Sequence, residues 1–477
     1  MPDPFISSKQ HLNTIIQLFH TLPRDDLQVI INAEKRIFIE SIKPAKEMKM
    51  IKHLSFLAGV SVAASFALAE KAYPASLPEM TVPQSLSVQL KGNCCAAEDL
   101  DKVKAAGFKY FRRGFIWEAV EKEKGVYDFS AYDTLMNDAK ERGLGVIACI
   151  AFSNKLYGHA KDPAGRVGYA NFAAALAERY KDYNVMFEIW NEPNTMTFWG
   201  KHGKKGNTEQ YALEYIGLVK EVVPAMRKAN PECTIIGGAT SGIWKDSYEW
   251  LNFCFKHGIL KTGIDAWSMH PYSCKTPEYY LVGYAKTRKM MADNGGPADF
   301  PMLNTERGFP IGKAEGYAGG DPKQSYEYQA WHFVRQYMID LLCNMRMTSW
   351  YEWSGKEGFN LLKDDKPTQA YTACKFMIEH LDGYKLSKRL PTEKPEDFVL
   401  LFEKGSGEQK LVAWTSPLND LSPDKTVNHA IDIPVEVSGA LEIYDIYGKK
   451  STVNAADGRI NLNLSGSPQY VALRGKK

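Results

Sequence analysis

The chain has 477 residues and a mass of 53.7 kDa, which is enough for one large enzyme fold or for two or three domains. Hydrophobic residues make up 44% and charged residues 24%, an ordinary globular composition that excludes bulk disorder. The net charge of +3 is too balanced for a protein that coats nucleic acid, so no nucleic-acid partner is expected. Aromatic residues reach 12%, which favours a groove where flat ligands stack.

Residues 48–69 have the pattern of a secretory signal peptide. Lys49 and Lys52 give a positive start, an uncharged apolar run follows, and Ala67-Leu68-Ala69 has the small residues of a signal-peptidase site. The run is shorter than the ~20 residues that a membrane span needs, so no span is expected after cleavage; an uncleaved anchor is the alternative. Because a signal should begin at the N-terminus, residues 1–47 indicate an over-extended start. The expected location is secreted or periplasmic.

Between residues 85 and 384, short apolar runs alternate with amphipathic segments. Strands that alternate with helices form a parallel sheet, and eight such units over this length fit an α/β fold, the (β/α)8 TIM barrel. A doubly wound open sheet is the main alternative, but it would carry a GxGxxG turn after an early strand, and the sequence has none there. The eight runs are 87–90, 110–115, 145–152, 185–191, 234–239, 266–270, 302–306 and 348–352.

The pattern changes in the last part of the chain. Residues 398–477 contain short alternating strands separated by Asp, Gly, Pro and Asn turns, which predict a small C-terminal antiparallel β-sandwich. Residues 385–397, with two prolines and many charges, are expected to be a linker, and residues 70–84 a linker or a strand that joins the sandwich. Trp414 lies in a central strand position, which favours a place in the core over a sugar platform.

Two glutamates follow strands of the predicted barrel, where the catalytic residues of barrel enzymes lie. Glu192 follows the fourth run and Glu306 ends the seventh, so the two carboxyls face each other across the barrel mouth. Glycosidic bond cleavage needs such a pair, one as a protonated acid and one as an ionised nucleophile. The alternatives are a helix-capping role for Glu192 and a salt bridge between Glu306 and Arg307. The eight cysteines show no metal-binding spacing, so no metal and no cofactor are expected.

Five motifs in chain order carry a resemblance to a known family: FRRGFIWEAVEKEKGVYDFSAYD at 111–133, FEIWNEPN at 187–194, DAWSMHPY at 265–272, TERG at 305–308 and SWYEWSG at 349–355. With them the sequence resembles the retaining glycoside hydrolases of clan A, and family 39 most closely, over residues 85–384. The resemblance implies a retaining mechanism with Glu192 as acid/base and Glu306 as nucleophile. By the same match, Asn191 would bond the sugar 2-hydroxyl.

The resemblance also implies roles for polar residues around the two glutamates. Arg112 matches the arginine at the end of strand two, with Arg113 as the alternative if the alignment shifts by one residue. A fixed cation near Glu306 would keep that carboxyl ionised, and the inward Glu188 is expected to pair with one of the two arginines. His270 and Tyr272 resemble the family's His-x-Tyr and are expected to orient Glu306; satisfied core polar residues are the alternative.

Three tryptophans are candidates for sugar platforms. Trp350 or Trp353, on strand eight, would floor the subsite that holds the cleaved sugar. Trp199, with the neighbouring Phe198, would support the leaving group. Packing in the core is the alternative for the strand-eight pair.

The sequence therefore predicts a secreted retaining hydrolase that cleaves O-glycosidic bonds in an oligo- or polysaccharide, with β-linked substrates favoured. Relatives in family 39 act on β-xylosides, α-iduronosides and bacterial exopolysaccharides, so the resemblance does not choose the sugar. Two alternatives are a family 5-like endoglycanase of the same clan and a non-catalytic glycan-binding barrel.

Overall fold

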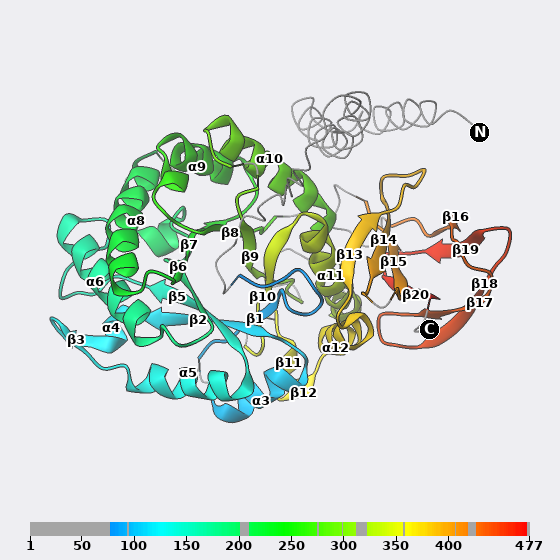
Figure 1. The fold of residues 1–477 in the computed structure, drawn as a ribbon, viewed down its shortest axis with the longest axis horizontal. Coiled ribbons are helices and arrows are strands. Elements are labelled where there is room, and N and C mark those ends of the chain that lie inside the picture. Colours follow the sequence, from blue (N-terminus) through cyan, green and yellow to red (C-terminus); the bar gives the residue numbers. More distant parts are fainter. Residues whose placement is uncertain are drawn as a thin grey trace, which may run out of the picture.

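The computed structural model describes residues 77–92, 95–200, 209–273, 276–297, 299–311, 322–355, 358–405, 407–417 and 426–474. Eight parallel strands close into a barrel in the order β1-β10-β9-β8-β7-β6-β5-β2, with helices around it (Figure 1). This confirms the predicted (β/α)8 fold. The barrel strands are β1 (Leu86–Gln89), β2 (Tyr110–Ile116), β5 (Gly145–Ala151), β6 (Val185–Ile189), β7 (Thr234–Ser241), β8 (Ala266–His270), β9 (Met302–Arg307) and β10 (Met345–Trp350).

The helices pack apolar faces on the outside of the strands, and local signals set several of their ends. Pro163 starts α6, where its missing N–H costs nothing, and Gly143 ends α5 in a left-handed conformation with φ of 67°. The ring consists of α3 (Ala97–Ala105), α5 (Ser130–Arg142), α6 (Pro163–Arg179), α8 (Glu209–Ala229), α9 (Lys245–Lys256), α10 (Tyr280–Asp293), α11 (Pro322–Leu342) and α12 (Gln369–Leu381).

Short elements connect these units. They are α4 (Trp117–Val120), β3 (Glu121–Glu123), β4 (Val126–Tyr127), α7 (Met196–Trp199), η1 (Ile259–Lys261), η2 (Pro277–Tyr279), β11 (Leu362–Lys363) and β12 (Lys366–Pro367). In the described part of the chain, no helix has the length and apolar character needed to cross a bilayer. The expected over-extended start at 1–47 and the expected signal at 48–69 lie outside the described residues.

The barrel interior has an apolar lower layer and a polar upper layer. The lower layer is a buried cluster that includes Leu77, which precedes the first strand, and the inward side chains Tyr110, Ile147, Met186, Ile236, Ala266, Leu303 and Met347. Because alternate strand residues share a face, the next inward residues lie one level higher, and these are Arg112, Glu188, Ser268 and Thr305. A charged, buried layer therefore lies directly below the mouth.

The C-terminal part forms antiparallel sheets that fit a sandwich. The larger sheet has the order β13-β14-β15-β20-β17-β18, and β16 pairs with β19. The expected linker at 385–397 is wrong in its first half, because Lys385–Arg389 forms edge strand β13 and pairs with β14. Before the barrel, Thr81 forms an isolated antiparallel bridge with Lys385. The strands are β13 (Lys385–Arg389), β14 (Asp397–Glu403), β15 (Gln409–Thr415), β16 (His429–Pro434), β17 (Gly439–Tyr444), β18 (Lys450–Ala455), β19 (Arg459–Leu464) and β20 (Gln469–Arg474).

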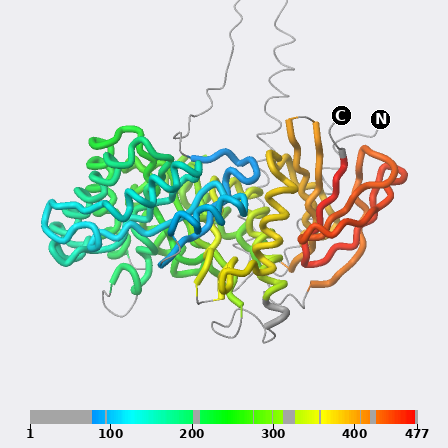
Figure 2. The backbone as a smooth tube through the Cα atoms, turned by 90° about the horizontal axis from the view of Figure 1, so that it is seen from below, coloured from blue at the N-terminus to red at the C-terminus, as the bar shows by residue number. Residues whose placement is uncertain are grey.

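A buried polar cluster ties these sheets to the barrel. Helices α11 and α12 lie between the barrel and the C-terminal strands (Figures 1 and 2). Glu278 of η2 is fully buried and accepts two hydrogen bonds from Arg335 of α11, at 2.7 and 2.6 Å. The indole N–H of Trp414 donates to the same carboxylate at 2.7 Å, and its ring stacks on Phe398. Trp414 is therefore a core residue at the junction.

Candidate active site

The two glutamates meet at the mouth of the barrel. Glu192 follows β6 and Glu306 lies on β9, and their side chains are 11% and 14% exposed. A carboxylate oxygen of each lies within 4.8 Å of the other. The backbone enters the left-handed region at Trp190, with φ of 70°, and again at Glu192, with φ of 47°. Strain of this kind persists where the surroundings fix it, and the Glu192 N–H is held by the Ala239 carbonyl at 3.1 Å.

Glu306 is held by two donors. Nη1 of Arg112 lies 2.8 Å from its Oε2, and the hydroxyl of Tyr272 donates to its Oε1 at 3.1 Å. Both contacts fix the position of the carboxylate. The Tyr272 ring lies over the guanidinium of Arg307, 4.9 Å from its centroid. Burial and the charge of Glu306 raise the pKa of Tyr272 well above its usual value, so this hydroxyl stays a donor.

Arg112 organises the polar layer below the glutamates. It is 2% exposed and bonds Gln89 at 2.9 Å, Asn191 at 2.8 Å and Glu188 at 2.6 Å, besides Glu306. Burial is the largest single influence and opposes the charged form of Glu188, but Arg112, His270 and two hydroxyl donors together outweigh it and hold the pKa of Glu188 below its usual range. Because Nη2 donates to the amide oxygen of Asn191, the amide NH2 is left as a donor for a ligand.

Arg113 points away from this layer and donates to the carbonyls of Leu90 and Gly92. The expected choice of Arg112 as the inward arginine, and its expected pairing with Glu188, therefore agree with the geometry.

His270 contacts the other glutamate from the one expected. It is fully buried, and its Nδ1 lies 3.1 Å from Oε1 of Glu192, whereas the expectation placed it against Glu306. Its Nε2 lies 3.2 Å from the hydroxyl of Thr305, which itself donates to Glu188 at 2.6 Å. Strand order alone would favour Glu306, which lies on the neighbouring strand β9, so the direction of the imidazole side chain decides the contact.

These contacts determine where the protons are. Glu188 is ionised and only accepts, so the single hydroxyl proton of Thr305 goes to it. Thr305 must then accept from His270, which fixes a proton on Nε2. The other ring nitrogen, Nδ1, then faces Glu192. An imidazole in this position can form a hydrogen bond with a carboxyl that has to hold and then release a proton.

The three predicted tryptophan platforms are wrong. Trp199 is fully buried against Trp190 and donates to Glu214 at 2.9 Å, because the short helix α7 turns it inward. Trp350 is 1% exposed and packs on Phe333 of α11. On β10, Met347 and Ser349 face the barrel interior, so Trp350 faces the helices by alternation.

Trp353 is also 1% exposed and contacts Phe108 and Tyr371 on the helical side. The aromatic side chain of this strand end that stays near Glu306 is Tyr351. It is half-buried, it influences the pKa of Tyr272, and its N–H donates to the Arg307 carbonyl at 3.2 Å. Sequence reasoning missed Tyr351, although its place one residue after an outward Trp350 was a usable signal.

Lys91 and Glu352 extend this side of the mouth. Lys91 lies over the Tyr351 ring, 4.4 Å from its centroid, and pairs with the buried Glu352 at 3.1 Å. On the opposite side, Phe198 stacks on Phe152 with centroids 5.7 Å apart, and both rings are half-exposed. Phe198 was an expected platform beside Trp199, whereas Phe152, which follows β5, was not singled out.

One group of side chains at the mouth has ligand atoms at metal-binding spacing. Glu192, His270 and Glu306 each offer one atom, all within 4.8 Å of one another. This donor set suits an ion such as Zn²⁺. The Arg112 guanidinium already neutralises Glu306, and its positive charge opposes a second cation beside it.

Comparisons with known proteins fit this geometry. Residues 70–286 match the family model for cellulase (glycosyl hydrolase family 5). A β-xylosidase of Geobacillus stearothermophilus is 32% identical over 115 residues, which cover 22% of this chain and only 20% of that enzyme.

Solved structures share the fold at lower identity. A family 39 glycoside hydrolase of Bacteroides cellulosilyticus WH2 has a TM-score of 0.63 at 22% identity. The match covers 84% of this chain and 82% of that enzyme's chain. A monomeric β-xylosidase of Caulobacter crescentus CB15 has a TM-score of 0.59 at 14% identity, covering 84% and 97%. A family 30 endoxylanase of Clostridium papyrosolvens C71 has a TM-score of 0.58 at 11% identity, covering 83% and 98%. The family model covers less than half of this chain, and the chain shares the fold of these solved glycoside hydrolases.

Proposed function

We propose that the protein hydrolyses β-linked glycosides with retention of anomeric configuration. The observation that carries the proposal is the pair of mouth carboxylates whose oxygens approach within 4.8 Å. Retaining enzymes keep the two carboxyls ~5–5.5 Å apart, whereas inverting enzymes need ~6.5–9.5 Å to admit a water between them. The different partners of the two groups match the two roles: donors surround Glu306, and the imidazole of His270 faces Glu192.

In the proposed first step, Glu306 attacks the anomeric carbon while Glu192 gives its proton to the departing oxygen. A covalent glycosyl-enzyme forms, and the leaving group departs as an alcohol. As the bond to carbon forms, the carboxylate of Glu306 loses charge, and the hydrogen bonds from Arg112 and Tyr272 weaken accordingly. The hydroxyl oxygen of Tyr272 lies beside Glu306, where its lone pairs can face the positive charge that develops on the sugar ring.

In the second step, Glu192 is ionised and removes a proton from water, which attacks the same carbon and releases the sugar. His270 supports this cycle because its Nδ1 accepts a hydrogen bond from protonated Glu192 and donates one when the proton shifts to the ring. The amide NH2 of Asn191, oriented by Arg112, is the proposed donor to the sugar 2-hydroxyl.

Xylose is the sugar we propose first. The curated relative is named a β-xylosidase, and two of the similar structures are described as a β-xylosidase and an endoxylanase. The match to the family 5 cellulase model supports a second candidate, an endoglycanase that acts on β-glucan.

The test is product analysis by proton NMR during hydrolysis of p-nitrophenyl β-xyloside and of β-1,4-xylan and β-1,4-glucan oligosaccharides. We expect the β-anomer to form first and Glu306→Gln to lose at least 10³-fold in kcat. Glu192→Ala should regain turnover with azide on an activated aryl glycoside. First formation of the α-anomer, or full activity in Glu306→Gln, would refute the mechanism, and sugar binding without cleavage would indicate a non-catalytic barrel.

Export is part of the proposal, and the pattern at residues 48–69 supports it. In a bacterial host, the chain should appear outside the cytoplasm with an N-terminus near residue 70. N-terminal sequencing of the exported protein decides this, and a cytoplasmic protein that keeps residues 48–69 would contradict it.

A further inference from the structure

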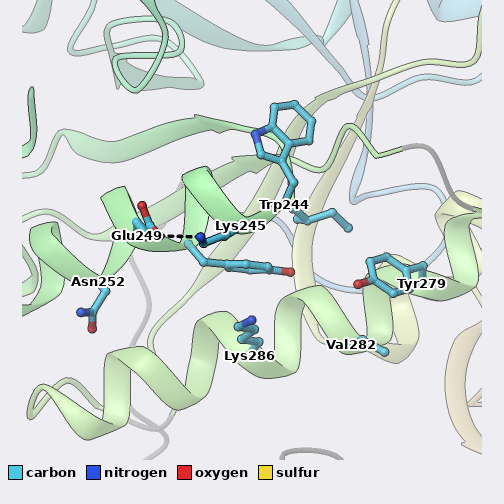
Figure 3. Close-up of a pocket in the computed structure, with 9 residues that line it drawn as sticks. Trp244, Lys245, Glu249, Asn252, Tyr279, Val282 and Lys286 are labelled. Carbon is cyan, nitrogen blue, oxygen red and sulfur yellow. Dashed lines mark ion pairs between the residues drawn. The ribbon is translucent and has the colours of Figure 1, made fainter. Parts of the chain in front are cut away.

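A hollow lies between two helices of the barrel, and its lining begins at Ile243, two residues after the end of β7. It lies between α9 and α10, with a volume of about 360 Å³, in the range of small-ligand sites (Figure 3). Trp244 lies at its upper end, and Asn252 and Lys286 lie lower down (Figure 3); Tyr248 also lines it. The walls therefore combine aromatic faces with amide, carboxylate and ammonium groups, the mixture that binds sugar rings and their hydroxyls.

Trp244 is unusual because it is 43% exposed while eight other tryptophans of the described chain are buried or nearly so. Its ring is nevertheless fixed. Gly242 has φ of 81°, and a Cβ at that position would lie 2.3 Å from three atoms of the indole. The indole therefore packs directly on the glycine backbone, which leaves its remaining surface to solvent in a set orientation.

The turn that carries Trp244 is bonded to the catalytic strands. The N–H of Gly242 donates to the His270 carbonyl at 2.8 Å, and the N–H of Ile243 donates to the Tyr272 carbonyl at 3.1 Å. One step earlier, Ser241 exchanges two hydrogen bonds with the Asn194 side chain, each of 2.9 Å. Trp244 follows Ser241 by three residues, which span at most about 10 Å. The ring therefore lies close to the strand end that these hydrogen bonds hold.

The position of the hollow determines which part of a bound glycan could reach it. Glu192 gives its proton to the leaving oxygen, so the leaving group lies on the β6 side of the mouth. Strand β7, which leads into Trp244, is the neighbour of β6. A chain that extends from the leaving group therefore passes toward β7 and α9.

We propose that Trp244 and the hollow below it form a distal subsite that binds a pyranose unit of a glycan chain on the leaving-group side. This deepens the proposed function and rests on it. The indole takes the apolar face of the ring, and Lys245 and Glu249, from the first turns of α9, line the same hollow and offer polar groups for its hydroxyls. The enzyme would then act preferentially on chains with several units beyond the scissile bond.

The experiment compares kcat/KM on p-nitrophenyl β-xyloside with that on β-1,4-xylo-oligosaccharides of two to six units, and on the matching gluco series. Trp244→Ala should lower the ratio of hexasaccharide to aryl glycoside about tenfold, and Trp244→Phe less. Tyr447→Ala removes an aromatic ring that is 37% exposed on the C-terminal sheets, and it should leave the ratio unchanged.

A second readout does not depend on turnover. In gels that contain soluble xylan, Glu306→Gln should be retarded, and the double variant Glu306→Gln/Trp244→Ala should be retarded less. Wild-type kcat/KM that does not rise with chain length, or an equal loss at every length in Trp244→Ala, would overturn the subsite while leaving the proposed hydrolysis intact. Wild-type inactivity on both series would refute the proposed function, and the subsite with it.

Discussion

Asp340 should make the folded protein less stable as the pH rises toward neutrality. Its carboxyl lies on α11 behind the barrel and is fully buried. It accepts hydrogen bonds from Asn304 and Thr348, both at 2.8 Å, and from Tyr284 at 3.0 Å. All three donors are neutral, so burial dominates and raises the pKa of Asp340 from 3.8 to about 7.

The sign follows from proton linkage. Between pH ~4 and 7 the unfolded chain ionises this group while the folded chain keeps it protonated, so unfolding releases a proton. Stability then falls by ~1.4 kcal/mol per pH unit, or about 4 kcal/mol across the window, and stays at the lower value above pH 7. Asp340→Asn cannot ionise, and its amide can serve the same three neighbours.

The assay is urea unfolding of wild type and Asp340→Asn at pH 4.5, 6 and 8. The variant should match wild type within about 1 kcal/mol at pH 4.5 and exceed it by up to about 4 kcal/mol at pH 8. The exposed Asp182→Asn should change stability by no more than ~0.5 kcal/mol at each pH. Parallel curves for wild type and Asp340→Asn, or a variant that is less stable at pH 8, would refute the reasoning.

Three further predictions concern contacts at the mouth and at the junction of the sheets. His270→Asn should lower kcat/KM about 100-fold on glycosides with poor leaving groups and far less on dinitrophenyl glycosides, because His270 serves the proton of the acid; equal losses would contradict this role. Tyr272→Phe removes the donor to Glu306 and should cost about 10- to 100-fold in kcat, measured at saturating substrate, and an unchanged kcat would exclude the contact from catalysis. Arg335→Met should cost about 3–5 kcal/mol of unfolding free energy by leaving Glu278 buried and unpaired, whereas the double variant with Glu278→Gln should recover part of it; a double variant no better than the single would contradict this pairing.

Much of the fold was predictable because its signals are local. Apolar runs, helical periodicity and turn residues lie within a few positions of one another, and all eight predicted runs overlap barrel strands. The error at Lys385–Arg389 has a physical cause: an edge strand bonds a partner on one side only, so it tolerates charged residues that otherwise indicate a linker.

At the site, the sequence placed both glutamates at strand ends, and it also placed Arg112, Asn191 and Tyr272 where the structure has them. Strand-end position is a local property, and the barrel converts it into a place at the mouth. Which neighbours a side chain contacts is not a local property, because it depends on the face of the strand on which the side chain lies. Trp350 faces the helices and Tyr351 the mouth because of the alternation of β10, and a shift of one residue exchanges the two.

The sequence by itself indicated the barrel, the sheets that follow it and the strand-end positions of the two carboxyls, because apolar periodicity and turn residues are local signals. Only the tertiary structure decided that His270 serves Glu192, that Trp199 is buried, and that Trp244 stays exposed against Gly242. Each of these depends on groups brought together from different strands and helices. Their distances and burial arise only when the barrel closes, and that closure also buries the charged layer that joins the two glutamates.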